Sequence, residues 1–361
     1  MGDLGPEPES IAMKRYVGLD VSLAETAVCV VDCEGCTVFA ACVASQPQAI
    51  AGVLRRRAGE VVRVVLETGQ LSTWLTRELR ALGLPVVCVD ARQAHRALSG
   101  RLNKSDPADA EGLAQLARTG WYREVHVKSL GSDRLRALLG ARDRLIRMRK
   151  DLESQIRGTL KAFGIRLGQV KPGKEREGFR VQVRVVTPED PALKTAISAL
   201  LAAHLAICRE YEQLDARLRR SARDHELITR MMTVPGVGPI TAAAFIAVID
   251  QPDRFKNATS VAAYIGLTPR RYQSGEVDYS GRISKSGDAM LRACLYEAAV
   301  ALLSRVERFS ALKSWGVRLA ARKGFRKAAV AVARKLALIL FRIWADATTF
   351  RWSQEVKMAA A

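Results

Sequence analysis

Four acidic side chains stand at positions where they could hold metal ions. Asp20 ends one predicted strand, "RYVGLD", and Glu67 ends another, "VVRVVLE". Asp106 and Asp109 are three residues apart at the predicted start of a helix, so they share one helix face. Carboxylates gathered in one place repel one another unless a cation neutralises them, and oxygen ligands favour Mg²⁺ or Mn²⁺. The four acids therefore predict a site for about two divalent ions, which could assist reaction at a phosphodiester.

A structural role explains part of this pattern. Aspartates at a helix N-terminus accept backbone N–H groups and suit the positive end of the helix dipole, which accounts for Asp106 and partly for Asp109. Capping does not explain why each of two apolar strands ends in an acid. Asp90 also ends an apolar strand and is a lesser candidate for the same site.

The elements around these acids predict a mixed α/β sheet. Three strands in a meander are followed by helix, strand, helix, strand and two further helices, which is the order of the ribonuclease H-like fold. In that fold the first and fourth strands lie side by side at the centre of the sheet. Asp20 and Glu67 would then be neighbours, and the last helix would bring Asp106 and Asp109 to the same edge.

The middle of the chain predicts an antiparallel coiled coil. Residues 134–163 and 193–218 show apolar residues at spacings of three and four, with His204 as a polar member of the seam rather than a ligand. In the second segment the predicted seam is Leu193, Ile197, Leu200, Ile207, Tyr211, Leu214 and Leu218. Between the helices, residues 164–192 form a Gly-, Pro- and charge-rich tip with one strand-like piece, "FRVQVRVV".

The last third predicts an all-helical domain that contains a helix-hairpin-helix. In "TVPGVGPIT", Gly236 and Gly238 would let backbone N–H groups approach a phosphate, although a plain helix turn also needs glycine where φ is positive. "RRYQSGEVDYSGRISKSG" is read as a polar loop. The candidate phosphate contacts are Lys104, Arg270, Arg271, Arg282 and Lys285.

These patterns divide the chain into five segments. The expected segments are a tail at 1–14, a ribonuclease H-like domain at 15–125, a coiled-coil domain at 126–228, a C-terminal domain at 229–346 and a tail at 347–361.

Charge is spread unevenly over 361 residues with a net charge of +20. The net charge is −1 over residues 1–125, +9 over 126–228 and +12 over 229–361. A neutral first third joined to two basic thirds favours a polyanionic partner, most simply nucleic acid, over a basic surface that is merely solvated.

Other features favour a cytoplasmic protein. No leader peptide and no uninterrupted apolar run of about 18 residues is apparent, so we expect no membrane partner. Seven cysteines without a framework suit a reducing compartment, and the single C-x-x-C, Cys33 and Cys36, has no second pair with which to bind zinc.

Five motifs in order carry a family resemblance from about residue 15 to 345. "YVGLDVS", "LETG", "NKSDPADA", "VPGVGPITA" and "IGLTPRRYQSGE" resemble the DEDD transposases of the insertion-sequence-110 type, relatives of the Piv/MooV invertases. The resemblance implies a RuvC-type nuclease domain whose four acids are Asp20, Glu67, Asp106 and Asp109. It also implies a serine nucleophile at Ser274. Residues 164–192 lie outside the recognised motifs.

The resemblance further implies partners. Such proteins act on target and donor DNA with a structured non-coding bridge RNA that pairs with both, and they work as dimers that assemble into tetramers. Serine would attack the DNA phosphodiester and a second strand would reseal it, in the cytoplasm of a bacterium and in association with the nucleoid. Two other readings remain open: a RuvC-like hydrolytic nuclease or junction resolvase that needs the acids but no serine, and a non-catalytic nucleic-acid scaffold.

Affinity for nucleic acid should fall steeply with salt, because Lys and Arg displace counterions condensed on phosphates. With about 6 to 10 phosphate contacts, binding should weaken by about 10³- to 10⁵-fold between roughly 50 and 200 mM salt. Fluorescence anisotropy across that range measures the slope, and a flat line would contradict the inference from charge.

Overall fold

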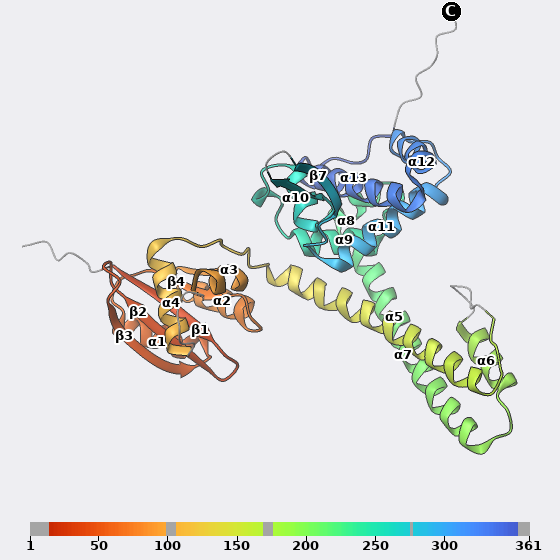
Figure 1. The fold of residues 1–361 in the computed structure, drawn as a ribbon, viewed down its shortest axis with the longest axis horizontal. Helices are drawn as coiled ribbons and strands as arrows, with labels where there is room; N and C mark the ends of the chain where they lie inside the picture. Colours follow the sequence, from red (N-terminus) through yellow and green to blue (C-terminus); the bar gives the residue numbers. More distant parts are fainter. Residues whose placement is uncertain (1–13, 99–105, 169–175, 275–276, 353–361) are drawn as a thin grey trace, which may run out of the picture. The chain divides into compact units, whose positions relative to one another are not determined.

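The chain folds into two compact units. A computed structural model describes residues 14–98, 106–168, 176–274 and 277–352. Unit 1 is Met1–Lys128 and unit 2 is Ser129–Ala361 (Figure 1).

Unit 1 is built on a mixed sheet of five strands in the order β3-β2-β1-β4-β5. β1 pairs antiparallel with β2 and parallel with β4; β2–β3 is antiparallel and β4–β5 is parallel. The strands are β1 (Arg15–Val21), β2 (Glu25–Val31), β3 (Thr37–Ala44), β4 (Val61–Glu67) and β5 (Val86–Val89). The helices are α1 (Pro47–Arg57), α2 (Ser72–Ala81), α3 (Ala91–Leu98) and α4 (Asp106–Thr119). The predicted mixed sheet and the order of its elements are confirmed.

The two faces of this sheet bury different helices. On one face, Leu19 and Leu66 belong to an apolar core with residues of α1 and α2 such as Leu54 and Leu79. On the other face, α4 covers β1, β2 and β4, and Ala110, Leu113, Ala114 and Ala117 of α4 pack there. Alternation along each strand therefore decides which side chains face α4.

α4 touches the backbone of β1 at Gly18. A Cβ at Gly18 would lie 2.0 Å from the Ala110 carbonyl oxygen and 2.3 Å from the Ala114 nitrogen. Both of these atoms are backbone, so no side chain can move away to make room. Gly18 therefore sets the distance between the helix that begins at Asp106 and the central strand.

Unit 2 begins with two 33-residue helices, α5 (Leu130–Ala162) and α7 (Pro191–Arg223). Ile156 and Leu160 near the end of α5 pack with Leu193 and Ile197 near the start of α7, so the two helices are antiparallel. Among the residues between them that the structure describes, α6 (Arg176–Val186) is a helix. The strand predicted for "FRVQVRVV" is thus wrong: Phe179 and Val183 are spaced for a helix and are buried against α5 and α7.

The seam of α7 differs from the predicted one in its middle. Leu201 and Cys208 are buried, whereas the predicted Leu200 and Ile207 are half-buried. From Leu193 to Cys208 the buried positions are still three or four residues apart and pass through His204, but Leu201 and Cys208 each come one residue later than the predicted seam positions. Cys208 is a buried position of the seam, but a search for leucine and isoleucine does not find it, so the predicted seam was assigned to Ile207 instead.

His204 is fully buried and contacts Glu153 of α5. Its Nε2 lies 3.2 Å from Glu153 Oε1, and that oxygen accepts a 2.7 Å hydrogen bond from Arg149. Burial disfavours the imidazolium, but hydrogen bonds with Cys208 and Glu153 and the charge of Glu153 outweigh it and raise the pKa of His204. Burial likewise opposes ionisation of Glu153, yet His204 and Arg149 lower its pKa.

α7 is the one helix among the described residues that is long and apolar enough, by length and composition alone, to span a membrane. That indication is weak, because the core helix of a globular domain meets the same criterion. α7 packs its seam against α5 and α6.

The rest of unit 2 surrounds a large apolar core with helices and one hairpin. The helices are α8 (Glu226–Met231), α9 (Pro239–Ile249), a 3₁₀ turn (Pro252–Arg254), α10 (Ala258–Ile265), α11 (Ala289–Ser304), α12 (Ala311–Lys323) and α13 (Phe325–Ala345). β6 (Pro269–Ser274) and β7 (Val277–Ile283) form an antiparallel pair. The prediction of a polar loop in an all-helical domain is therefore wrong: polar side chains masked the alternation of the strands.

Gly18→Ala should destabilise unit 1, because the added methyl group would meet backbone atoms. We expect a loss of about 1 to 3 kcal/mol in the free energy of unfolding, with faster hydrogen exchange at β1 amides. Gly69→Ala is the matched control, since nothing lies within 4 Å of a Cβ there; it should change stability by less than about 0.5 kcal/mol. Equal stability of the two variants would contradict the close approach of α4.

Glu153→Gln should lower stability in a pH-dependent way. Because the pKa of His204 is raised on folding, protonated His204 contributes fully to the free energy of unfolding below pH 6.5, the ordinary pKa of histidine. This contribution is lost as the pH rises through the pKa of His204 in the folded protein. Because the pKa of Glu153 is lowered on folding, ionised Glu153 contributes fully to the free energy of unfolding above pH 4.5. This contribution is lost as the pH falls through the pKa of Glu153 in the folded protein. Urea unfolding should therefore show the largest difference from wild type between these values. The exposed Glu210→Gln should show no such maximum.

Candidate active site

The register of the central strands places Asp20 and Glu67 next to each other. β1 and β4 run parallel, with Gly18 opposite Val65 and Leu19 opposite Leu66. One step further along each strand lie Asp20 and Glu67. Residues that match in parallel strands project from the same face, so these two acids share a face at the carboxyl ends of neighbouring strands.

That face is the one that α4 covers. Asp20 is two residues beyond Gly18, whose backbone lies against Ala110 and Ala114. Ala27, which pairs with Asp20, packs with the same two alanines. Since α4 begins at Asp106, its first turn lies towards the strand ends that carry the two acids. The first turn of α4 and the ends of β1 and β4 therefore lie towards the same edge of the sheet.

The surroundings of the four acids differ. Asp20, Glu67 and Asp109 are half-buried. The side chain of Asp106 lies outside the part that the structure describes, although its backbone begins α4. Among the described residues, no group of three or more His, Cys, Asp and Glu side chains is placed to hold a metal ion. The metal-binding role of the four acids stays a prediction.

The neighbouring strand ends are joined through Thr68, which the sequence did not single out, and beside it lies the lesser candidate Asp90. Thr68 follows Glu67; its backbone N–H donates to Val89 at 2.9 Å, and its hydroxyl accepts from the Ala91 N–H at 3.1 Å. Asp90 accepts a 3.0 Å bond from the Gln93 N–H, so it caps α3. A threonine directly after a strand-ending acid was the available signal for this contact.

The turn before α9 has a structural explanation for one of its glycines. Gly236 has a φ of +85°, and a Cβ there would lie 2.4 Å from the Ala298 carbonyl oxygen of α11. Nothing lies within 4 Å of a Cβ at Gly238, which precedes Pro239 as the N-cap of α9. Packing thus accounts for Gly236, and Gly238 is the more open of the two for a ligand.

Ser274 is the last residue of β6, where it pairs with Val277. Its side chain lies outside the part that the structure describes.

The basic side chains near this hairpin are not equivalent. Arg271 donates two hydrogen bonds to Asp278, at 2.9 and 2.5 Å, which raises the pKa of Arg271 and lowers that of Asp278. Arg270 donates to the Ser284 carbonyl oxygen at 3.2 Å. Arg282 and Lys285 are exposed and, among the described residues, have no ion-pair partner. Lys104 lies outside the described residues. Arg282 and Lys285 are therefore the better candidates for phosphate contact.

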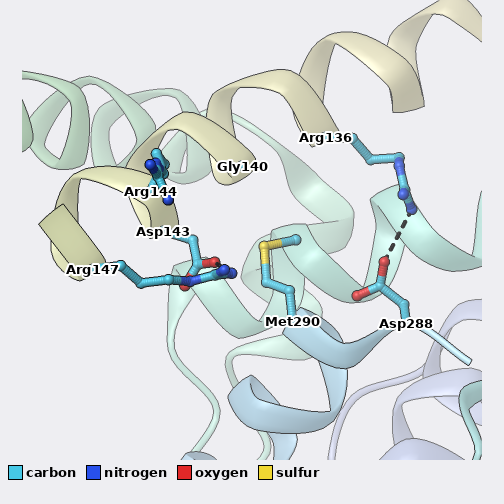
Figure 2. Close-up of a pocket in the computed structure, with 7 residues that line it drawn as sticks. All are labelled: Arg136, Gly140, Asp143, Arg144, Arg147, Asp288 and Met290. Carbon is cyan, nitrogen blue, oxygen red and sulfur yellow. Dashed lines mark hydrogen bonds and ion pairs between the residues drawn. The ribbon is translucent and has the colours of Figure 1, made fainter. Parts of the chain in front are cut away.

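A further cavity of about 310 Å³ lies between α5 and the start of α11 (Figure 2). Arg136 donates to Asp288 at 3.2 Å, and Asp288 also caps α11 by accepting from the Leu291 N–H. Arg147 pairs with Asp143. The lining residues are Arg136, Gly140, Asp143, Arg144, Arg147, Asp288 and Met290. Three arginines and two aspartates line this cavity, so it favours anions slightly. In the sequence, the spacing that puts the three arginines and Asp143 on one face of α5 was the signal for it.

Comparisons with known proteins give one consistent family. Residues 17–165 match the family model for the DEDD transposase of IS110, and residues 228–314 match that of the transposase IS116/IS110/IS902 family. The transposase for insertion sequence element IS1111A of Coxiella burnetii is 28% identical over 93% of this chain and 91% of its own. A probable family 20 transposase of Pseudomonas aeruginosa is 30% identical over 80% of this chain and 85% of its own.

One solved structure is also similar. The RuvC structure of Thermus thermophilus aligns with 31% of this chain and 99% of its own at 17% identity, with a TM-score of 0.24.

Proposed function

The chain belongs to the IS110 family of DEDD transposases, and from this premise we propose that it cuts and rejoins DNA by metal-assisted transesterification, with Ser274 as nucleophile and a structured RNA as guide. The observation that carries the proposal is the register of β1 and β4. It sets Asp20 and Glu67 side by side on the face against which α4 begins.

The acid set suits divalent ions. Asp20, Glu67, Asp106 and Asp109 offer only carboxylate oxygens, the ligand type that Mg²⁺ and Mn²⁺ prefer. About two such ions, when bound, would neutralise charge that develops on the attacking and leaving oxygens of a phosphodiester. Asp20 and Glu67 would orient these ions, because the sheet fixes their positions at the ends of two hydrogen-bonded strands.

Ser274 would supply the covalent step. Its hydroxyl oxygen would bond to the scissile phosphorus while the bond from phosphorus to the leaving sugar oxygen breaks, and the hydroxyl proton passes to that oxygen through solvent or a carboxylate. A hydroxyl from a second strand would then displace the serine by the same chemistry. Each step exchanges one phosphate ester for another, so rejoining requires no external energy source.

The basic thirds of the chain would bind the nucleic acids. A protein that contacts backbone and shape can leave sequence recognition to base pairing, as guided systems do. We infer target and donor DNA and a bridge RNA as partners, in the cytoplasm of a bacterium close to its nucleoid. Joining two duplexes needs several protomers, and α5 and α7 are the candidate elements for assembling dimers into a tetramer.

Trapping of a covalent adduct tests this proposal. Wild-type protein, the RNA from the element's flanks, Mg²⁺ and labelled element-end DNA should give a protein–DNA adduct that survives denaturation. Ser274→Ala should abolish the adduct, whereas Ser284→Ala, its matched control beyond β7, should retain it. Asp20→Asn should reduce strand cutting by at least about 10³-fold, because it removes a proposed metal ligand.

The other outcomes separate the alternatives. Cutting that needs Mg²⁺ and Asp20 but survives Ser274→Ala would indicate a hydrolytic nuclease or junction resolvase. Wild-type behaviour of Asp20→Asn in every assay, without any need for Mg²⁺, would indicate a non-catalytic scaffold. Adduct formation in the absence of the RNA would support the proposed transesterification by Ser274 and contradict the proposed role of the RNA as guide.

A further inference from the structure

Two tyrosines form an exposed aromatic pair on the β6–β7 hairpin. Tyr272 of β6 is directly opposite Tyr279 of β7. Their ring centroids are 5.0 Å apart and their planes differ by 19°, so the rings are stacked. Tyr272 is 46% exposed and Tyr279 is 55% exposed. Large aromatic side chains this accessible to water are available for contact with a partner.

The hairpin leaves space beside this pair. Gly281 lies two residues beyond Tyr279, and a Cβ there would be 3.4 Å from Cε2 of Tyr272. The ion pair of Arg271 with Asp278 comes from alternate positions of the two strands, so it lies on the opposite face. One face of the hairpin is therefore charged and internally paired, and the other is flat and aromatic.

Stabilising the hairpin does not by itself require this arrangement. A cross-strand aromatic pair contributes about 0.2 to 1 kcal/mol, and β-branched pairs do the same. The sheet has only the two strands β6 and β7, and both tyrosine rings on its aromatic face keep large exposed areas. The excess aromatic surface is the feature that calls for a ligand with flat faces.

The chemistry around the pair matches a nucleic-acid strand. The exposed cations Arg282 and Lys285 follow Gly281 and can contact phosphates. Position 274 is two residues from Tyr272 on the same strand, so both positions belong to one face of the hairpin. A strand bound there would place a base on the tyrosines, with exposed cations further along the same segment of the chain at Arg282 and Lys285.

We propose that Tyr272 and Tyr279 stack an unpaired base of the DNA strand next to the phosphate that Ser274 attacks. This inference rests on the proposed function for the identity of that phosphate, whereas the stacking itself does not depend on catalysis. Stacking on aromatic side chains accepts any base, because every base has a π face. The pair would thus hold a distorted strand in place without reading its sequence.

Binding of a simple single strand tests the stacking. The probe is a thymidine oligodeoxynucleotide of about 20 nucleotides, longer than the roughly 4 to 16 that one single-strand site covers. Tyr272→Leu and Tyr279→Leu should each weaken binding by about 5- to 150-fold per base lost, whereas Tyr272→Phe and Tyr279→Phe should stay within about 2-fold. Phe309→Leu, an exposed aromatic residue of the same unit (62% exposed) outside the hairpin, should also stay within about 2-fold. Equal affinity of the leucine and phenylalanine variants would overturn the proposal.

Photocrosslinking gives a second readout that needs no destabilising substitution. The same oligonucleotide carrying 5-iodouracil is irradiated with full-length Ser274→Ala protein without Mg²⁺, and the joined peptide is found by mass spectrometry. Joining at Tyr272 or Tyr279 supports the proposal; joining only at other aromatic residues overturns it. Preferential joining of the matching RNA strand at these tyrosines would also overturn it, since the proposed occupant is DNA.

The two proposals fail in different ways. Tyrosine crosslinks without any serine adduct on element-end DNA would leave the stacking intact and remove the transesterification. A serine adduct formed at the wild-type rate by both leucine variants, with no crosslink at the hairpin, would retain the chemistry and remove the stacking.

Discussion

The contact between α4 and β1 is the constraint on which the candidate site depends. Because Gly18 has no side chain, α4 lies against the backbone of the central strand, with Ala110 and Ala114 at the point of contact. Any larger residue at position 18 would lift the helix and carry its first turn away from the strand ends. The parallel register of β1 with β4 then fixes the second pair of positions, Asp20 and Glu67. Together these two backbone contacts fix the positions of the acids in the chain fold, so contacts made by the acidic side chains themselves are not needed for that placement.

The two units differ in net charge, and the difference matches the roles proposed for them. Unit 1 carries the four acids of the proposed metal site on a nearly neutral background. Unit 2 carries most of the excess of Lys and Arg, and several of its arginines are already paired, such as Arg142 with Asp215 and Arg271 with Asp278. The cations without carboxylate partners, such as Arg282 and Lys285, are the ones able to release counterions on binding.

Sequence patterns predicted unit 1 well and unit 2 less well, for a physical reason. Strands buried on both faces, such as β4 and β5, are continuous apolar runs bounded by clear turns, so their order and the acids at their ends could be read directly. α6 and the hairpin could not, because Phe179 and Val183 alternate with polar residues in a way that fits both periods, and because the face of β6 and β7 that carries the two tyrosines holds too few apolar residues to reveal a strand. Ser274 gained its place only from the family resemblance. The stacked tyrosines could be found only from the strand register, which pairs residues that are seven apart along the chain.

The hairpin that carries Ser274 is anchored at one end. An isolated pair of strands is marginally stable in water, but here the segment after β7 packs tightly on α10, where a Cβ at Gly287 would lie 2.1 Å from the Tyr264 carbonyl oxygen. Arg292 of α11 donates to the carbonyl oxygens of Ile265 and Gly287, at 3.0 and 2.5 Å, and closes this junction. Position 274 is at the opposite end of the hairpin, so its placement depends on the cross-strand contacts between. The proposed nucleophile would thus be positioned by the β6–β7 ladder, whose other end is fixed at the junction of α10 and α11.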